Sequence, residues 1–196
     1  MVLFLSKSVY VVDIFLETHL HPTMNVSLIL LQSLDGFIAH DLTDNLSWGT
    51  KEDKQFFRTK TKEAGCMIMG SSTFENMPFP LAFQNRFSYV LTSNPQKYSE
   101  LNQSPLVRFL SATPTEILQQ AKQDGYENVV VIGGGKINSA FLQNNLIDEI
   151  YVTIAPHIFG DGIAGFGRLN LNTQLHLESV KTITEHEILC HYKVVK

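Results

Sequence analysis

The feature that most constrains the fold is an apolar run that ends in three consecutive glycines. Residues 129–132 are three valines and one isoleucine, and Gly133, Gly134 and Gly135 follow them directly. A short β-branched run of this kind is typical of a strand buried on both faces, as in a parallel sheet covered by helices. Glycines between such a strand and a helix let the backbone approach a ligand and leave helix N–H groups free for an anion. A turn that only requires a positive φ explains the same glycines equally well.

The rest of the chain alternates between strand-like and helix-like segments. Strands are expected over residues 26–31, 67–69, 87–91, 106–110, 128–132 and 149–154. Helices are expected over 51–62 with Thr50 as its cap, after Gly70, from Thr113 to near Gly125, and over 136–143. A glycine-rich loop over 157–172 precedes two strands, 174–184 and 186–195, which a tight turn at Glu185 joins. This order predicts an α/β fold with a mainly parallel central sheet flanked by helices and a C-terminal antiparallel hairpin at its edge.

The length of 196 residues favours one domain, which we expect to span residues 24–196. Residues 1–23 are apolar enough to resemble a signal peptide, but Asp13 and Glu17 interrupt the run and no small-residue cleavage site follows. We expect these residues to form an N-terminal extension outside the fold.

The charge and cysteine content limit the partners and the compartment. A net charge of −4 without any basic run argues against nucleic acid, and no segment suggests a membrane partner. Cys66 and Cys190 each stand in an apolar run without Cys-x-x-Cys spacing, which indicates buried thiols and a cytoplasmic location. His19 and His21 share a strand face, but no second pair with ligand spacing accompanies them, so no metal site is expected.

Two common phosphate loops do not match the glycine triplet. The loop G-x-x-x-x-G-K-[ST] would need glycine at Val130 and a hydroxyl residue at Ile137. The fingerprint G-x-G-x-x-G, counted from Gly133, would need glycine at Asn138. The context of the triplet therefore has to decide its role.

Five motifs in order supply that context. They are Ser33–Ala39, Met67–Glu75, Val131–Lys136, Tyr151–Pro156 and Gly160–Gly162. Together they resemble the dihydrofolate-reductase-like superfamily, and residues 160–162 are more similar to its riboflavin-biosynthesis reductase domain than to folate reductases.

The resemblance implies a nicotinamide dinucleotide, usually NADPH, across the carboxyl edge of the sheet. It places the pyrophosphate at two helix starts and the adenosine beside a third strand end. The implied cofactor-binding residues are Ala39, Gly70, Ser72, Thr73, Leu91, Thr92, Ser93, Ile132, Gly134, Gly135, Lys136 and Ile137. Members commonly have arginine where this chain has Ser71, so NADH is not excluded as the cofactor.

A hydride transfer to a C=N bond leaves a nitrogen that must be protonated, and such a site usually has one acid in an apolar cleft. The spacing of Trp48, Asp53 and Phe57 matches the folate-reductase pattern, with Asp53 as the catalytic acid. Thr153 is expected beside Asp53 as the second catalytic residue, and Trp48, Phe57 and Arg86 as substrate-binding residues. The alternative for Asp53 is a solvated residue that favours the helix start, and for Arg86 a solvated charge at a strand edge.

The function expected from the resemblance is an NADPH-dependent reductase of a small heterocycle, similar to the 5-amino-6-(5-phosphoribosylamino)uracil reductase domain of riboflavin biosynthesis. Lys54 and Arg58 stand where that branch tends to have two arginines for the ribose phosphate, which leaves the substrate open. Dihydrofolate reduction is one alternative, and a nucleotide-binding protein of this fold without catalysis is another. A homodimer through the C-terminal hairpin or an edge strand is also expected.

Overall fold

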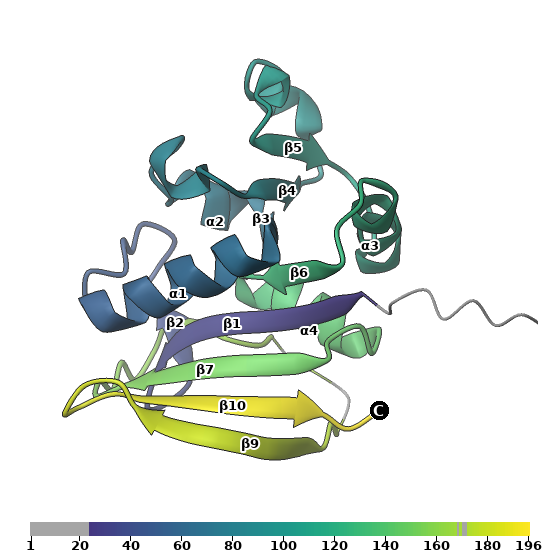
Figure 1. Cartoon of the computed structure of the whole chain (residues 1–196). Coiled ribbons are helices and arrows are strands. Elements are labelled where there is room, and N and C mark those ends of the chain that lie inside the picture. Colours follow the sequence, from purple (N-terminus) through teal and green to yellow (C-terminus); the bar gives the residue numbers. More distant parts are fainter. Residues whose placement is uncertain (1–23, 168, 170–171) are drawn as a thin grey trace, which may run out of the picture.

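An eight-stranded sheet forms the framework of the computed structural model, which describes residues 24–167, 169 and 172–196 (Figure 1). The expected N-terminal extension, residues 1–23, lies outside the described residues. The strand order is β5-β4-β3-β6-β1-β7-β10-β9. The strands are β1 (Asn25–Ser33), β3 (Cys66–Gly70), β4 (Phe87–Leu91), β5 (Val107–Leu110), β6 (Asn128–Val131), β7 (Glu149–Ala155), β9 (Leu175–Thr182) and β10 (Ile188–Val194).

The sheet is parallel except at its C-terminal edge. Strands β5, β4, β3, β6, β1 and β7 pair in parallel, whereas β10 is antiparallel to both β7 and β9. The carboxyl ends of the parallel strands therefore share one edge, where loops and helix starts meet. The fold expected from the sequence, including the C-terminal hairpin, is confirmed.

Four helices connect these strands and cover the two faces of the sheet (Figure 1). They are α1 (Lys51–Ala64), α2 (Ser71–Glu75), α3 (Pro114–Gln123) and α4 (Gly135–Gln143). Local capping explains where two of them begin. The Thr50 side chain accepts a hydrogen bond from the backbone N–H of Asp53, and Thr113 forms a reciprocal capping box with Glu116.

Each face of the sheet has its own hydrophobic core. Helices α3 and α4 pack Ile117 and Phe141 against one face, while Phe74, Phe83 and Phe109 gather on the other. Strand β3 lies between the two cores and is buried on both sides, since its residues Met67 and Ile68 point in opposite directions and neither is exposed. This double burial explains why the parallel strands read as continuous apolar runs.

Two parts of the C-terminal region differ from the sequence expectation. The strands of the hairpin are shorter than expected, because residues 183–187 form a wider turn closed by a bond from Ile183 N to Glu187 O. The loop expected over 157–172 contains a short strand, β8 (Ile163–Ala164), which pairs with β2 (Phe37–Ala39) in a separate ribbon. The β2–β8 ribbon depends on pairing between segments distant in sequence, which a local pattern does not reveal.

Candidate functional site

Helix α1 places Asp53 against the sheet rather than in solvent. Asp53, Phe57 and Thr61 follow at intervals of one helical turn and all face inward, with Asp53 only 7% exposed. The backbone N–H of Asp53 donates to Thr50 Oγ1 at 3.2 Å, which fixes the first turn of the helix. The solvated alternative for Asp53 is therefore wrong.

The strands under this turn present Thr153 to Asp53. The register places Leu31 of β1 and Leu189 of β10 on either side of Thr153 of β7, so these three side chains share the face that α1 covers. Thr153 is 1% exposed, and its hydroxyl makes no hydrogen bond of standard geometry. The expected neighbourhood of Asp53 and Thr153 is present.

The surroundings of Asp53 raise its pKa above the ordinary value. Burial of the carboxyl group is the largest cause, and the charge of Glu187 acts in the same direction. The Thr153 hydroxyl and the Lys54 ammonium lower the pKa but do not outweigh burial. A carboxyl group with a raised pKa at a sheet edge can stay protonated nearer to neutral pH, as a proton donor requires.

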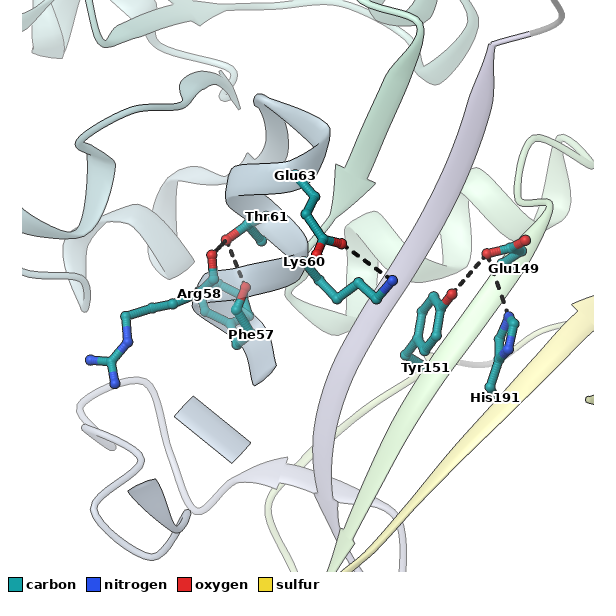
Figure 2. Close-up of polar contacts among 8 residues, drawn as sticks. All are labelled: Phe57, Arg58, Lys60, Thr61, Glu63, Glu149, Tyr151 and His191. Carbon is teal, nitrogen blue, oxygen red and sulfur yellow. Dashed lines mark hydrogen bonds and ion pairs between the residues drawn. The ribbon is translucent and has the colours of Figure 1, made fainter. Parts of the chain in front are cut away.

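A second set of contacts holds α1 on β7 further from Asp53 (Figure 2). Tyr151 stacks on His191 at 4.2 Å between ring centroids, and Glu149 accepts a hydrogen bond from the Tyr151 hydroxyl at 3.0 Å. Lys60 of α1 lies over the Tyr151 ring, 5.4 Å from its centroid. Tyr151 and Thr153 point to the same side of β7, so these contacts also help to set the distance between helix α1 and Thr153.

Trp48 and Phe57 have different surroundings, because Trp48 lies in the loop before α1 and Phe57 in the second turn of the helix. Trp48 donates to Asp44 at 3.3 Å and meets the ring of Phe159 edge to face at 5.1 Å. Phe57 packs partly against the aromatic core on its own side of the sheet. Between Trp48 and the helix cap, Gly49 is buried and so close to Leu31 that an added Cβ would lie 2.5 Å from Leu31 Cδ2. A side chain at this position would require Leu31 to move, so glycine allows the loop to pack directly on Leu31 beside Asp53.

The glycines after β3 and β6 meet at the same edge of the sheet. The N–H of Gly70 donates to Gly133 O at 2.8 Å, and an added Cβ on Gly134 would lie 3.5 Å from Thr73 Oγ1. Helix α4 begins at Gly134 without any side-chain cap, so its first N–H groups have no side-chain acceptor. An added Cβ on Gly135 would lie 2.3 Å from Ala164 O, so the β8 segment closes over this helix start. We call the set Gly70, Thr73, Gly134 and Gly135 the glycine cradle.

The ends of β4 and β5 form a hollow of about 290 Å³ beside the glycine cradle. Its lining is Leu91, Thr92, Ser93, Ser111, Ala112, Pro114, Ile137, Ala140 and Phe141. Leu91, Thr92, Ser93 and Ile137 were expected from the sequence, and the structure brings all four together. Among the described residues that line the hollow, none carries a charge.

The remaining cofactor candidates lie around the cradle. Ile132 donates its N–H to Ile68 O at 3.0 Å and is half-buried, whereas Ser72 and Lys136 are exposed on the first turns of α2 and α4. Ala39 lies at the end of β2, where its carbonyl oxygen would be 2.5 Å from an added Cβ on Gly162.

The structure places Arg86 in a structural position. Its guanidinium donates to Ala82 O, with Nε at 2.8 Å, and to the Thr61 hydroxyl, and the residue is 6% exposed. The solvated alternative for Arg86 is therefore wrong, and its donors are already engaged by the protein. These contacts argue against Arg86 as a substrate ligand.

Sequence reasoning missed Glu187 and five residues of the hollow, which are Ser111, Ala112, Pro114, Ala140 and Phe141. Glu187 precedes the last strand, in a polar stretch that gave no sign of burial, yet it is 1% exposed. The signal that could have found it is the alternation of β10, which puts Glu187 on the same side as Leu189.

Other classes of site find no support in the part of the chain that the structure describes. No group of three or more histidine, cysteine or acidic side chains is arranged to hold a metal ion there. Within the same residues, no helix has both the length and the apolar character needed to cross a bilayer. Cys66 and Cys190 are both buried free thiols, as expected. The homodimer stays a prediction.

The mainly parallel sheet with its glycine cradle and terminal hairpin defines a dihydrofolate-reductase-like α/β protein. More specifically, the chain belongs to the family of RibD C-terminal domains, whose model matches residues 25–189. Members of this family are generally reductase domains.

One curated relative and two solved structures show what the chain is similar to. "Uncharacterized protein YwjB" of Bacillus subtilis (strain 168) is 28% identical over 177 residues, which cover 84% of this chain and 95% of that protein. A putative riboflavin biosynthesis protein from Shewanella sp. PV-4 has a similar fold, with a TM-score of 0.72 at 21% identity over 88% of this chain and all of that one. Dihydrofolate reductase from Enterococcus faecalis, complexed with NADP(H) and RAB-propyl, matches with a TM-score of 0.61 at 26% identity over 88% of this chain and 97% of that one.

Proposed function

We propose that this chain is a reductase that uses NADPH or NADH to reduce a C=N bond of a small nitrogen heterocycle, with Asp53 as the proton donor. The observation that carries the proposal is a buried carboxyl group with a raised pKa at the same sheet edge as the glycine cradle. Proton donor and anion-binding turns at one edge are what a dinucleotide-dependent reduction needs.

The residues at this edge fit a dinucleotide. The uncapped start of α4 offers N–H groups to a pyrophosphate, and the absence of a side chain at the half-buried Gly134 leaves room for a close approach, whereas Gly135 is buried under Ala164. Gly70, Ser72, Thr73, Gly134, Gly135 and Lys136 would hold the pyrophosphate, and the hollow bounded by Leu91, Thr92 and Ser93 would take the adenosine. When bound, the nicotinamide would supply the hydride. Ala39, Ile132 and Ile137 would contact the bound dinucleotide between its pyrophosphate and its nicotinamide.

The chemistry of the chain's own residues is proton delivery in a site partly shielded from water. Asp53 would donate its proton to the nitrogen left by hydride transfer, and Thr153 would orient the carboxyl group or an intervening water. Phe57 and Trp48 would bound the space for a flat ring near the start of α1. The resulting carboxylate would regain a proton from solvent before the next turnover.

The contacts of Arg86 favour an aminopyrimidine of the riboflavin branch over dihydrofolate as the substrate. A folate reductase would need a free arginine for the glutamate carboxylate, and Arg86 is engaged with Ala82 and Thr61. Lys54 and Arg58, by contrast, are exposed cations on the turns of α1 next to Asp53 and Phe57. They can meet the phosphate of a phosphoribosyl group.

Titration with NADPH and NADH tests the cofactor part of the proposal. Binding should raise the midpoint of thermal unfolding and quench the fluorescence of Trp48. Energy transfer from Trp48 should also increase the emission of the reduced nicotinamide. Thr73→Val should weaken binding about 5- to 10-fold, because it removes a hydroxyl from the glycine cradle. Thr59→Val, on the outer side of α1, is the matched control and should leave binding unchanged. If neither dinucleotide bound at millimolar concentration, the proposal would be wrong.

Replacement of the proposed acid tests the catalytic part. Asp53→Asn should lower turnover of a reducible aminopyrimidine by about 100-fold or more at neutral pH, since the amide has no proton to give. Glu52→Gln changes the neighbouring exposed carboxylate in the same way and should leave turnover within a factor of two. Equal activity of Asp53→Asn and wild type would remove Asp53 from the mechanism. Cofactor binding without turnover across aminopyrimidines, pterins and dihydrofolate would favour the non-catalytic alternative.

A further inference from the structure

Glu187 is a buried carboxyl group at the proposed site that no motif predicted. It lies in the hairpin turn before β10 and is 1% exposed. Its backbone N–H donates to Thr184 Oγ1 at 3.0 Å, and its carbonyl accepts from Ile183 N at 3.0 Å. The turn therefore holds Glu187 in a defined position with its side chain directed inward.

Thr50 links Glu187 to Asp53. The Thr50 hydroxyl donates to Glu187 Oε2 at 2.5 Å and accepts the backbone N–H of Asp53 at 3.2 Å. A hydroxyl has one proton to donate, and Thr50 directs it to Glu187. Oε2 is thus held as an acceptor, and Oε1 is left outside this link.

Two buried oxygens beside this link lack partners among the described residues. Glu187 Oε1 and Thr153 Oγ1 are both fully shielded from solvent and have no hydrogen-bond partner of standard geometry. An unpaired buried polar atom costs about 1–3 kcal/mol, so such atoms usually have a role. Glu187 shares the Thr50 hydroxyl with the first turn of α1, and both Glu187 and Thr153 act on the Asp53 carboxyl group. Both oxygens therefore belong to the space around the Asp53 carboxyl group.

We propose that Glu187 and Asp53 form a buried carboxyl pair that retains one proton between them, and that this pair rather than Asp53 alone is the proton-donating unit. Glu187 acts through Asp53 and is in this sense a positioning residue. The inference rests on the proposed reductase function for its catalytic consequence, but the sharing of the proton does not depend on turnover.

The physical reason is the cost of two negative charges in one desolvated space. Two carboxyl groups that interact in a buried site ionise in separate steps, and the first ionisation opposes the second. Burial is the main cause of the raised pKa of Asp53, and the charge of Glu187 adds to it. The other titratable groups on the elements packed around the pair are Asp44 in the loop before α1; Lys51, Glu52, Lys54, Arg58, Lys60, Lys62 and Glu63 on α1; Glu149 and Tyr151 on β7; and Glu185, His186, Cys190, His191, Tyr192 and Lys193 on β10 and its turn. Of these, Lys54 opposes the effect of Glu187 on Asp53.

During turnover the pair would lose one proton and regain one. The proton would leave Asp53 for the substrate nitrogen as the hydride, with its two electrons, reaches the adjacent carbon. The C=N bond becomes CH–NH, the dinucleotide is oxidised, and the pair is left with two negative charges. This doubly charged state is unfavourable in the buried site, so uptake of a proton from water would restore the donor.

Carbon-13 NMR of the chain labelled at the aspartate carboxyl carbons tests the pair without any substrate. The Asp53 signal is assigned by its absence in Asp53→Asn. In wild type it should titrate above the ordinary aspartate range, and in Glu187→Gln its midpoint should fall by about one pH unit, a roughly tenfold change in proton affinity. Glu185→Gln, an exposed carboxylate of the same turn, is the matched control and should leave the midpoint in place.

A conservative variant tests whether misfolding, and not loss of the Glu187 charge, lowers the Asp53 midpoint. Glu187→Asp keeps the charge with a shorter side chain, and it should retain most of the raised midpoint while Glu187→Gln loses it. An Asp53 midpoint that is the same in wild type and in a folded Glu187→Gln variant would overturn the proposal. So would equal shifts in Glu187→Gln and Glu185→Gln.

The pH dependence of turnover then separates this inference from the proposed function. In Glu187→Gln the loss of kcat with rising pH should begin about one unit lower than in wild type, with KM for the dinucleotide unchanged. A merely structural role would lower kcat equally at every pH, which would contradict the proposal. A shifted NMR midpoint in a chain that binds neither NADPH nor NADH would leave the carboxyl pair established and refute the reductase assignment.

Discussion

Replacing Arg86 by alanine should destabilise the fold by about 3 kcal/mol. The residue lies just before β4 and ties the turn around Ala82 to helix α1. Because its guanidinium is nearly inaccessible to solvent, water cannot replace the lost donors without opening the packing.

The magnitude follows from the groups that lose a partner. Ala82 O accepts from both Nε and Nη2 of Arg86, and a hydrogen bond from a charged donor contributes about 1.5–3 kcal/mol. Thr61 Oγ1 loses a donor but still donates to Phe57 O at 2.7 Å, so its loss is smaller (Figure 2). The alanine variant no longer has to bury a charged guanidinium, and this gain offsets part of the lost hydrogen-bond energy. The net destabilisation is therefore about 3 kcal/mol. Arg86→Lys keeps the charge without the fork of donors and should lose about half as much.

Urea unfolding followed by Trp48 fluorescence measures this loss. With a slope of about 2 kcal/mol per molar urea, the midpoint of Arg86→Ala should fall by about 1.5 M. Arg58→Ala is the matched control, because Arg58 is exposed and its guanidinium bonds only Gln55, at 3.2 Å; its midpoint should stay within about 0.3 M. The structural assignment would be refuted if the urea midpoint of Arg86→Ala decreased by less than about 0.5 M. It would also be refuted if the variant kept full stability and lost only its affinity for substrate.

Three further outcomes follow from local contacts. Thr113→Ala should cost about 1 kcal/mol by removing the capping box with Glu116, measured by urea unfolding against Thr115→Ala as the control. The Ser33 hydroxyl and the N–H groups of residues 159 and 160 lower the pKa of Asp35 from 3.8 to about 2. The stability that Asp35 contributes is therefore complete above pH 3.8 and lost as the pH falls towards 2, and acid unfolding of Asp35→Asn should lack this component. Burial raises the pKa of the Cys66 thiol to about 12, so in the folded chain at pH 8 mass spectrometry should find Cys66 unalkylated by iodoacetamide; rapid labelling would contradict its burial.

The elements that the sequence predicted well are those with local signals. The β-branched run before Gly133 produces β6, and the caps Thr50 and Thr113 mark the starts of α1 and α3. In each case the residues that determine the structure lie within a few positions of it. The parallel pairing of the central strands followed from the alternation of strands and helices along the chain.

The features that the sequence did not predict depend on contacts between distant segments. Glu187 reaches Asp53 through Thr50 across 137 residues, and although alternation in the expected strand 186–195 puts Glu187 on the side of Leu189, nothing near it indicates that Thr50 covers it. Arg86 was expected to be accessible because charged residues at strand starts usually are, but tertiary contacts with α1 bury it. The pairing of β2 with β8 has the same origin, since strands of two or three residues carry no periodic signal.

The position of β10 between β7 and β9 has a consequence for how the two parts of the site are held in place. The glycine cradle is built from segments that end by residue 143, whereas Glu187 lies in the turn that precedes the last strand, which pairs with β7. Confining the long chain between Thr50 and Glu187 costs conformational entropy, which the packing of β10 on β7 has to offset. On the proposed function, a substitution that loosens the last strand would therefore disturb the proton donor more than the cradle that holds the dinucleotide.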